Sequence, residues 1–142
     1  MLGRKDYTKE ELDSATSAIN KQLAAYKKLA KAVDASSDVK VQSALDEFEP
    51  LFFNHMTLSL DRYFVHRVRA VAGKDCNPLN EVELLTESLM LNDGVMRGNN
   101  VIKFVPEKSV LKLNIGDRVR VNAAQFERLA KAFLAEIERK FR

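Results

Sequence analysis

The stretch FFNHMTLSLDRYFVHRVR (residues 52–69) decides the fold of this 142-residue chain. Wound as an α-helix, it carries large apolar side chains around most of its circumference, which is typical of a central helix with several neighbours. Pro50 suits the first turn of a helix, and Gly73 can adopt the left-handed conformation that ends one. We therefore expect a central helix over residues 50–72.

The same stretch contains both histidines of the chain and three of its arginines. On a helix, five of the polar side chains fall within roughly 40° of one line: His55, Ser59, Arg62, His66 and Arg69. Such a stripe could line a pocket for an anionic small molecule, or it could pair with the acidic side chains of residues 75–93. In the second case we expect Arg62 or Arg69 to contact a carboxylate of that segment. The candidate ligand-binding residues are His55, Ser59, Arg62, Tyr63, His66 and Arg69.

Metal, cofactor and nucleophilic chemistry find little support in the sequence. On one straight helix His55 and His66 would be roughly 16 Å apart, too far to bind one zinc ion. Cys76 is the single cysteine, so neither a disulfide framework nor a zinc finger with paired ligands can form. No serine lies in a nucleophile elbow, and Cys76 has only Lys74 as a nearby cation. We expect no metal and no cofactor, assign no catalytic residue, and lean against an enzyme.

Upstream of the central helix, the pattern predicts two further helices. Thr8 and Glu11 form a capping-box pair, which indicates that a long amphipathic helix begins there. A shorter helix follows from about residue 39 to residue 48, with a kink or restart at residues 48–50 because of Pro50. The apolar seam of the first helix could pack inside the domain or join two copies, and a homodimer is our expectation. Its members are Leu12, Ala15, Ile19, Tyr26, Leu29 and Val33.

Two more helices are predicted downstream. NPLNEVELLTESLMLNDG (residues 77–94) indicates a helix capped by Asn77 or Asn80. Asn122 and Gln125 form the capping pair of a C-terminal helix with a wide apolar stripe. The stripe of the C-terminal helix is expected to dock into the main core.

Between these two helices the periodicity changes to alternation. VLKLNIGDRVRV (residues 110–121) predicts an antiparallel β-hairpin at about residues 109–121, with Gly116 in the turn. The predicted fold class is therefore α+β and predominantly helical: one domain over residues 1–142, a four- to five-helix bundle with a small hairpin before the C-terminal helix. One face of the hairpin would be basic. With a loop arginine, the candidate anion or nucleic-acid residues are Arg97, Lys112, Arg118 and Arg120.

Composition and charge narrow the function classes. No run approaches the roughly 20 apolar residues of a membrane span, and the N-terminus MLGRKDYTKEEL lacks the apolar core of a secretory signal. We therefore expect a cytoplasmic protein without membrane contact. Residues 73–93 carry one basic and five acidic side chains, whereas residues 94–142 carry eleven basic and five acidic ones. The two segments could neutralise each other, or the second could meet an anionic partner.

The strongest signals of the sequence are packing signals, so a non-catalytic binding or assembly protein is the favoured function. One alternative is a small enzyme or ligand-binding protein with a pocket lined by histidine and arginine. A second alternative is nucleic-acid binding through the basic hairpin. Nucleic acid is disfavoured because the hairpin lacks the interleaved exposed aromatic side chains of a single-strand platform.

Overall fold

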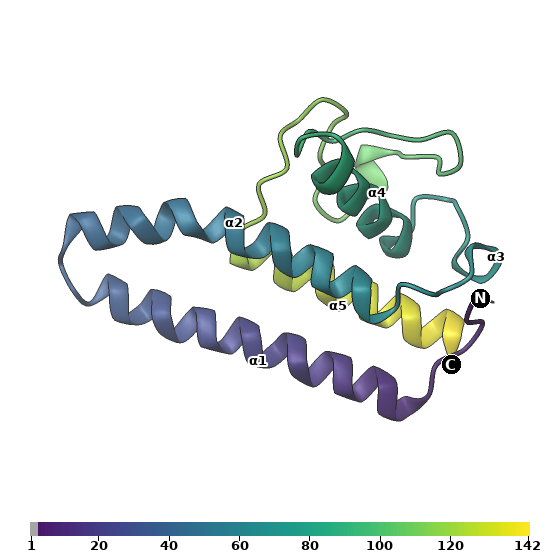
Figure 1. Cartoon of the computed structure of the whole chain (residues 1–142), viewed down its shortest axis with the longest axis horizontal. Coiled ribbons are helices and arrows are strands. Elements are labelled where there is room, and N and C mark those ends of the chain that lie inside the picture. Colours follow the sequence, from purple (N-terminus) through teal and green to yellow (C-terminus); the bar gives the residue numbers. More distant parts are fainter. Residues whose placement is uncertain (1–2) are drawn as a thin grey trace.

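The computed structural model describes residues 3–142, and over this range the chain is helical without a β-sheet (Figure 1). A short 3₁₀ turn, η1 (Pro106–Lys108), interrupts the long connection between the last two helices. Two isolated bridges are the only β-type pairings in this part of the chain. The α-helices are α1 (Lys9–Asp34), α2 (Val39–Tyr63), α3 (Arg69–Ala72), α4 (Pro78–Leu91) and α5 (Ala123–Phe141).

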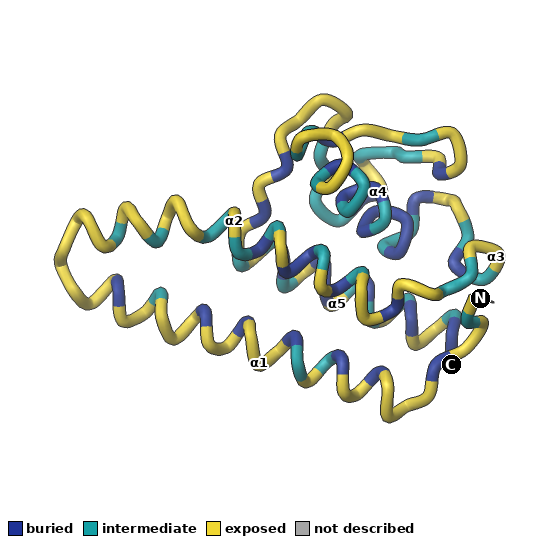
Figure 2. Tube along the Cα trace, in the orientation of Figure 1, coloured by how far each residue is buried: buried dark blue, intermediate teal, exposed yellow. Residues whose placement is uncertain are grey.

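Helices α1 and α2 form an antiparallel hairpin, and α5 packs along both of them. Helix α4 packs on α2 and α5. The loop end of the α1–α2 hairpin extends beyond the other helices, as Figure 1 shows. In Figure 2 this end of α2 is largely exposed, while the buried residues gather where α2, α4 and α5 meet.

The seam of α1 is an internal packing surface. Ile19 is 1% exposed, and Leu12, Ala15, Tyr26 and Val33 are also buried within the chain. Burial of this kind is the main favourable term in folding. Apart from Leu29, which is 48% exposed, the side chains of the seam already pack inside the domain, so little of it is left for a second copy.

The predicted helix starts of α1, α4 and α5 are confirmed. Capping boxes join Thr8 with Glu11, Asn77 with Asn80, and Asn122 with Gln125. Each satisfies backbone N–H groups that the first turn of a helix leaves without partners.

Of the kink or restart expected at residues 48–50, helix α2 excludes the restart. It runs without interruption from Val39 to Tyr63, with Pro50 inside it, and Figure 1 shows it bending part-way along its length. An internal proline removes one helical hydrogen bond and typically kinks the helix. Aromatic packing supports the helix next to the proline, since Tyr26 stacks on Phe52 with a ring separation of 5.8 Å.

The end of α2 corrects a second prediction, because the helix stops at Tyr63 and does not reach residue 72. The N-terminal segment takes the backbone groups that a longer helix would need: the Arg4 N–H donates to the His66 carbonyl at 2.6 Å, and the Val68 N–H donates to the Arg4 carbonyl at 2.9 Å. Phe64 turns into the core beside Tyr7, with ring centroids 4.9 Å apart. Gly73 adopts the expected positive φ, but it does so after the short helix α3.

Arg67 closes the C-terminal end of α2. Its guanidinium donates to the Phe64 carbonyl at 2.9 Å and forms an ion pair with Asp61 at 2.7 Å. The two side chains are 7% and 16% exposed. Positive charge at this end is favoured by the helix dipole.

Replacing Arg67 by alanine is expected to lower the free energy of unfolding by about 3 kcal/mol, because the mostly buried Asp61 carboxylate would lose its partner. Urea denaturation measures this change. Arg69→Ala is the control: its ion pair with Glu83 is half-exposed, so its removal should cost at most about 1 kcal/mol. If Arg67→Ala lowers the free energy of unfolding no more than Arg69→Ala does, the Arg67 ion pair is not what stabilises the end of the helix.

The predicted β-hairpin at residues 109–121 is wrong. The backbone N–H groups of Val110 and Leu111 donate to the two carboxylate oxygens of Glu81 at 2.7 and 2.9 Å. Lys112 has a φ of 56°, which a strand does not allow. These contacts occupy the backbone of the first expected strand.

The second expected strand finds other partners. Gly94 accepts from the Val119 N–H at 2.8 Å, and the Asn54 side chain bonds both the Val119 carbonyl and the Val121 N–H. The carboxylate of Glu49 accepts from the Ala123 N–H at 2.8 Å. Side chains of α2 and α4 thus hold this connection to the bundle, in place of a β-ladder.

Candidate functional site

The six predicted ligand-binding residues do not share one helix. His55, Ser59, Arg62 and Tyr63 lie on α2, His66 lies in the turn after it, and Arg69 begins α3. The Arg69 guanidinium pairs with Glu83 of α4 at 3.1 Å, which confirms the expected charged contact with the segment of residues 75–93. The polar stripe therefore ends at Arg62, and Arg69 belongs to a structural ion pair.

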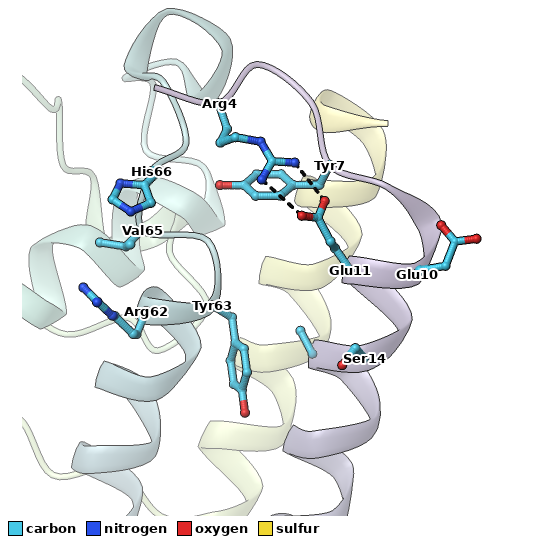
Figure 3. Close-up of a pocket in the computed structure, with 10 residues that line it drawn as sticks. Arg4, Tyr7, Glu10, Glu11, Ser14, Arg62, Tyr63, Val65 and His66 are labelled. Carbon is cyan, nitrogen blue, oxygen red and sulfur yellow. Dashed lines mark hydrogen bonds and ion pairs between the residues drawn. The ribbon is translucent and has the colours of Figure 1, made fainter. Parts of the chain in front are cut away.

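Three of the six, Arg62, Tyr63 and His66, line an open depression of about 430 Å³ (Figure 3). Its other wall comes from the N-terminal segment and the start of α1. Figure 3 shows the Arg62 and His66 side chains on one side of this depression and Glu11 on the other. The opposite wall contains Arg4, Tyr7, Glu10, Glu11, Ser14 and Ala15.

One of the two arginines that line the depression, Arg4, already forms an ion pair within the chain. Arg4 donates to both carboxylate oxygens of Glu11, at 3.1 and 2.8 Å. Hydrogen bonding from Arg4, assisted by the Thr8 N–H, lowers the pKa of Glu11 to about 2. The Arg4 guanidinium also lies 4.6 Å from the centre of the Tyr7 ring, a cation–π contact. Arg4 is thus fully engaged within the chain.

The charge balance of the depression does not favour an anion. Two arginines, Arg4 and Arg62, face two carboxylates, Glu10 and Glu11, so an anionic ligand would meet as much negative as positive charge. Burial raises the pKa of Tyr7, which keeps its hydroxyl protonated. That hydroxyl is buried and has no hydrogen-bond partner among residues 3–142. The site offers mixed charge and one covered donor, which is a weak basis for anion binding.

No catalytic pair is assembled around the histidines in the described part of the chain. His55 places Nδ1 2.9 Å from the Leu51 carbonyl, a contact within its own helix. No hydrogen bond joins His66 to Tyr7, Ser14 or Tyr63, the residues with hydroxyl groups that share its depression. Within residues 3–142 no group of three potential metal ligands comes together. Cys76 is a buried free thiol that contacts the Val105 backbone.

The hairpin that was expected to align basic side chains on one face is absent from the described chain, residues 3–142. Arg118 donates to the Asp93 carbonyl at 3.0 Å, and the Lys112 ammonium donates to the Glu107 carbonyl at 3.0 Å. Arg97 and Arg120 are exposed elsewhere on the same connection. The structural basis for the nucleic-acid alternative, a basic ribbon, is therefore missing.

A different surface stands out on α2. Its core-facing residues include Phe53, Met56 and Leu60, and the opposite side of the helix bears residues spaced alternately three and four apart. This side is open to solvent: Phe48 is 45% exposed and Leu51 is 61% exposed. We call it the outer stripe; it consists of Val41, Ala44, Phe48, Leu51, His55, Leu58 and Arg62.

The outer stripe continues onto α4 through a small groove. The groove has a volume of about 130 Å³ and lies between the two helices. Met90 and Leu91 at the end of α4 are exposed beside it, at 64% and 77%. Single exposed apolar residues are ordinary, but a regular apolar row is not. The groove is lined by Leu51, Asn54, His55, Leu58, Leu89 and Met90.

Sequence reasoning assigned His55 and Arg62 to a polar stripe and did not recognise that the apolar residues beside it form one row. The signal was present, because Phe48, Leu51 and Leu58 continue the alternating spacing of three and four that marks a helix–helix seam. The predicted break at Pro50 hid it, since it divided the row between two helices.

Comparison with protein-family models, curated proteins and solved structures finds no match to this chain. None of the helices in residues 3–142 is both long and apolar enough to cross a bilayer. Function is therefore inferred from the residues and their geometry.

Proposed function

We propose that this chain is a non-catalytic cytoplasmic assembly protein that forms a symmetric homodimer through the outer stripe of α2. The observation that supports the proposal is the row itself: apolar side chains spaced by three and four residues along a continuous helix, on the side that faces away from the core. In folded proteins this spacing packs a helix against another helix.

Apolar side chains of the outer stripe are exposed to water in the single chain. Phe48, Leu51 and Val41 remain 45%, 61% and 42% exposed in the isolated chain. Covering apolar surface yields about 25 cal/mol for each Å² removed from water. A partner helix would cover Phe48 and Leu51 together, and it would also fill the groove beside Leu58.

A second copy is the simplest partner for this row. It supplies a helix of equal length with the same spacing, so the row of one copy can interdigitate with the row of the other. Two-fold symmetric dimers are also the commonest oligomers of soluble proteins. Because α1 buries its own seam inside the domain, α2 is the long helix that has an apolar face to share.

Light scattering at micromolar concentration tests the proposal. We expect a mass of about twice 16.1 kDa, because both copies bury their outer stripes. A mass that stays at 16.1 kDa on concentration to the millimolar range would contradict self-association.

A further inference from the structure

We infer that the two α2 helices of this dimer run antiparallel, with the two-fold axis beside His55, so that Glu47 of each copy contacts Arg62 of the other. The inference rests on the proposed homodimer and adds its orientation and register. It is carried by two unpaired charges of opposite sign that flank the part of the apolar row from Phe48 to Leu58.

Both charges are available for a partner. Glu47 and Arg62 are exposed, and neither forms an ion pair with any residue of the described chain, 3–142. Most of the other charges around the end of α2 are engaged: Asp61 pairs with Arg67, and Arg69 pairs with Glu83.

The positions of the two charges define an orientation. Glu47 borders the outer stripe next to Phe48, and Arg62 ends it after Leu58. At 1.5 Å of rise per residue, the two lie roughly 22 Å apart along the helix, with the apolar residues between them. In coiled coils, charges that border the apolar seam choose the orientation of the partner.

A parallel arrangement would place each charge beside the identical charge of the other copy. Glu47 would then approach Glu47 of the other copy, and Arg62 would approach Arg62. An antiparallel arrangement instead brings Glu47 to Arg62 twice, once at each end of the interface. The electrostatic difference between the two arrangements therefore favours the antiparallel one.

The same pairing fixes the register. The midpoint between positions 47 and 62 lies between Asn54 and His55, which places the two-fold axis there. Leu51 of one copy then faces Leu58 of the other, beside the groove between α2 and α4. Lys40, another exposed charge near the row, falls beyond the end of the other copy's α2.

A charge-swap experiment tests the orientation. We expect Glu47→Arg alone and Arg62→Glu alone each to raise the Kd of the dimer roughly tenfold at low salt, because each replaces two attractive contacts by two repulsive ones. The double variant Glu47→Arg/Arg62→Glu should return the Kd close to the wild-type value. Dilution series followed by light scattering measure all four proteins, and Lys28→Glu on the exposed side of α1 serves as the control.

The outcomes separate this inference from the proposed function. Full rescue in the double variant supports the antiparallel register. Without rescue, or if single reversals leave the Kd unchanged, the orientation is wrong although the dimer stands. A wild-type protein that is monomeric throughout overturns the proposed function itself, and the orientation with it.

Discussion

Replacing Leu51 by aspartate is expected to turn the dimer into a monomer without loss of helix. Leu51 lies in the middle of the outer stripe and is 61% exposed in the single chain. In the dimer, each copy would lose the burial of a leucine, worth about 1.5–3 kcal/mol, and would place an unpaired carboxylate in an apolar interface. By symmetry this occurs twice, so we expect the Kd to rise by at least about 100-fold. Light scattering measures the mass, and circular dichroism measures the helix content.

The matched control is Ile115→Asp. Ile115 is 50% exposed, close to the exposure of Leu51, but it lies in the turn before Gly116 and outside the outer stripe. This variant should keep the mass of the wild-type protein. If both variants dissociate the dimer equally, or if Leu51→Asp leaves it intact, the outer stripe is not the interface. Loss of helix in Leu51→Asp would indicate a folding role, in which case Leu51→Gln, which adds no charge, decides between the two.

Replacing Glu81 by alanine is expected to lower the free energy of unfolding by about 3 kcal/mol. Glu81 is 2% exposed, and its two carboxylate oxygens accept from the Val110 and Leu111 N–H groups. Without them, two part-buried backbone donors lose their partners, at up to about 1–3 kcal/mol each. Urea denaturation measures the loss. Glu83→Ala on the same helix, which removes a half-exposed ion pair with Arg69, should cost less than about 1 kcal/mol.

The pH dependence of stability gives a second readout for Glu81. Burial raises the pKa of this carboxyl above 4.5, and the two backbone hydrogen bonds only partly oppose the shift. Between 4.5 and the raised value the folded protein binds more protons than the unfolded chain, so this group makes stability fall as pH rises. Glu81→Gln should remove that decline. An unchanged pH profile in Glu81→Gln would mean that the carboxyl titrates equally in both states.

The candidate site was only partly predictable from the sequence. Arg62, Tyr63 and His66 were predicted and do line one depression, but Arg4, Glu10 and Glu11 from the N-terminal part of the chain form its other wall. Contacts between segments so distant in the sequence leave no local pattern. The negative charges of the two glutamates balance the positive charges of the two arginines. The depression therefore has no net positive charge that would attract an anion.

The sequence by itself determined the starts of α1, α4 and α5 and the apolar faces that they bury. These features are local: a capping side chain bonds a backbone group about three residues away, and a helical face repeats every 3.6 residues. The sequence also placed an unmatched row of apolar side chains on the segment that became α2.

Only the tertiary structure decided where α2 ends, what replaces the hairpin, and which helix face remains open. Arg4 takes backbone groups near His66, and Glu81 takes those of Val110 and Leu111, so distant residues outcompete the local helix and strand patterns. The seam of α1 and the outer stripe of α2 are both apolar rows. The fold buries the first and leaves the second in water, because α2 can pack only one side on α1, α4 and α5.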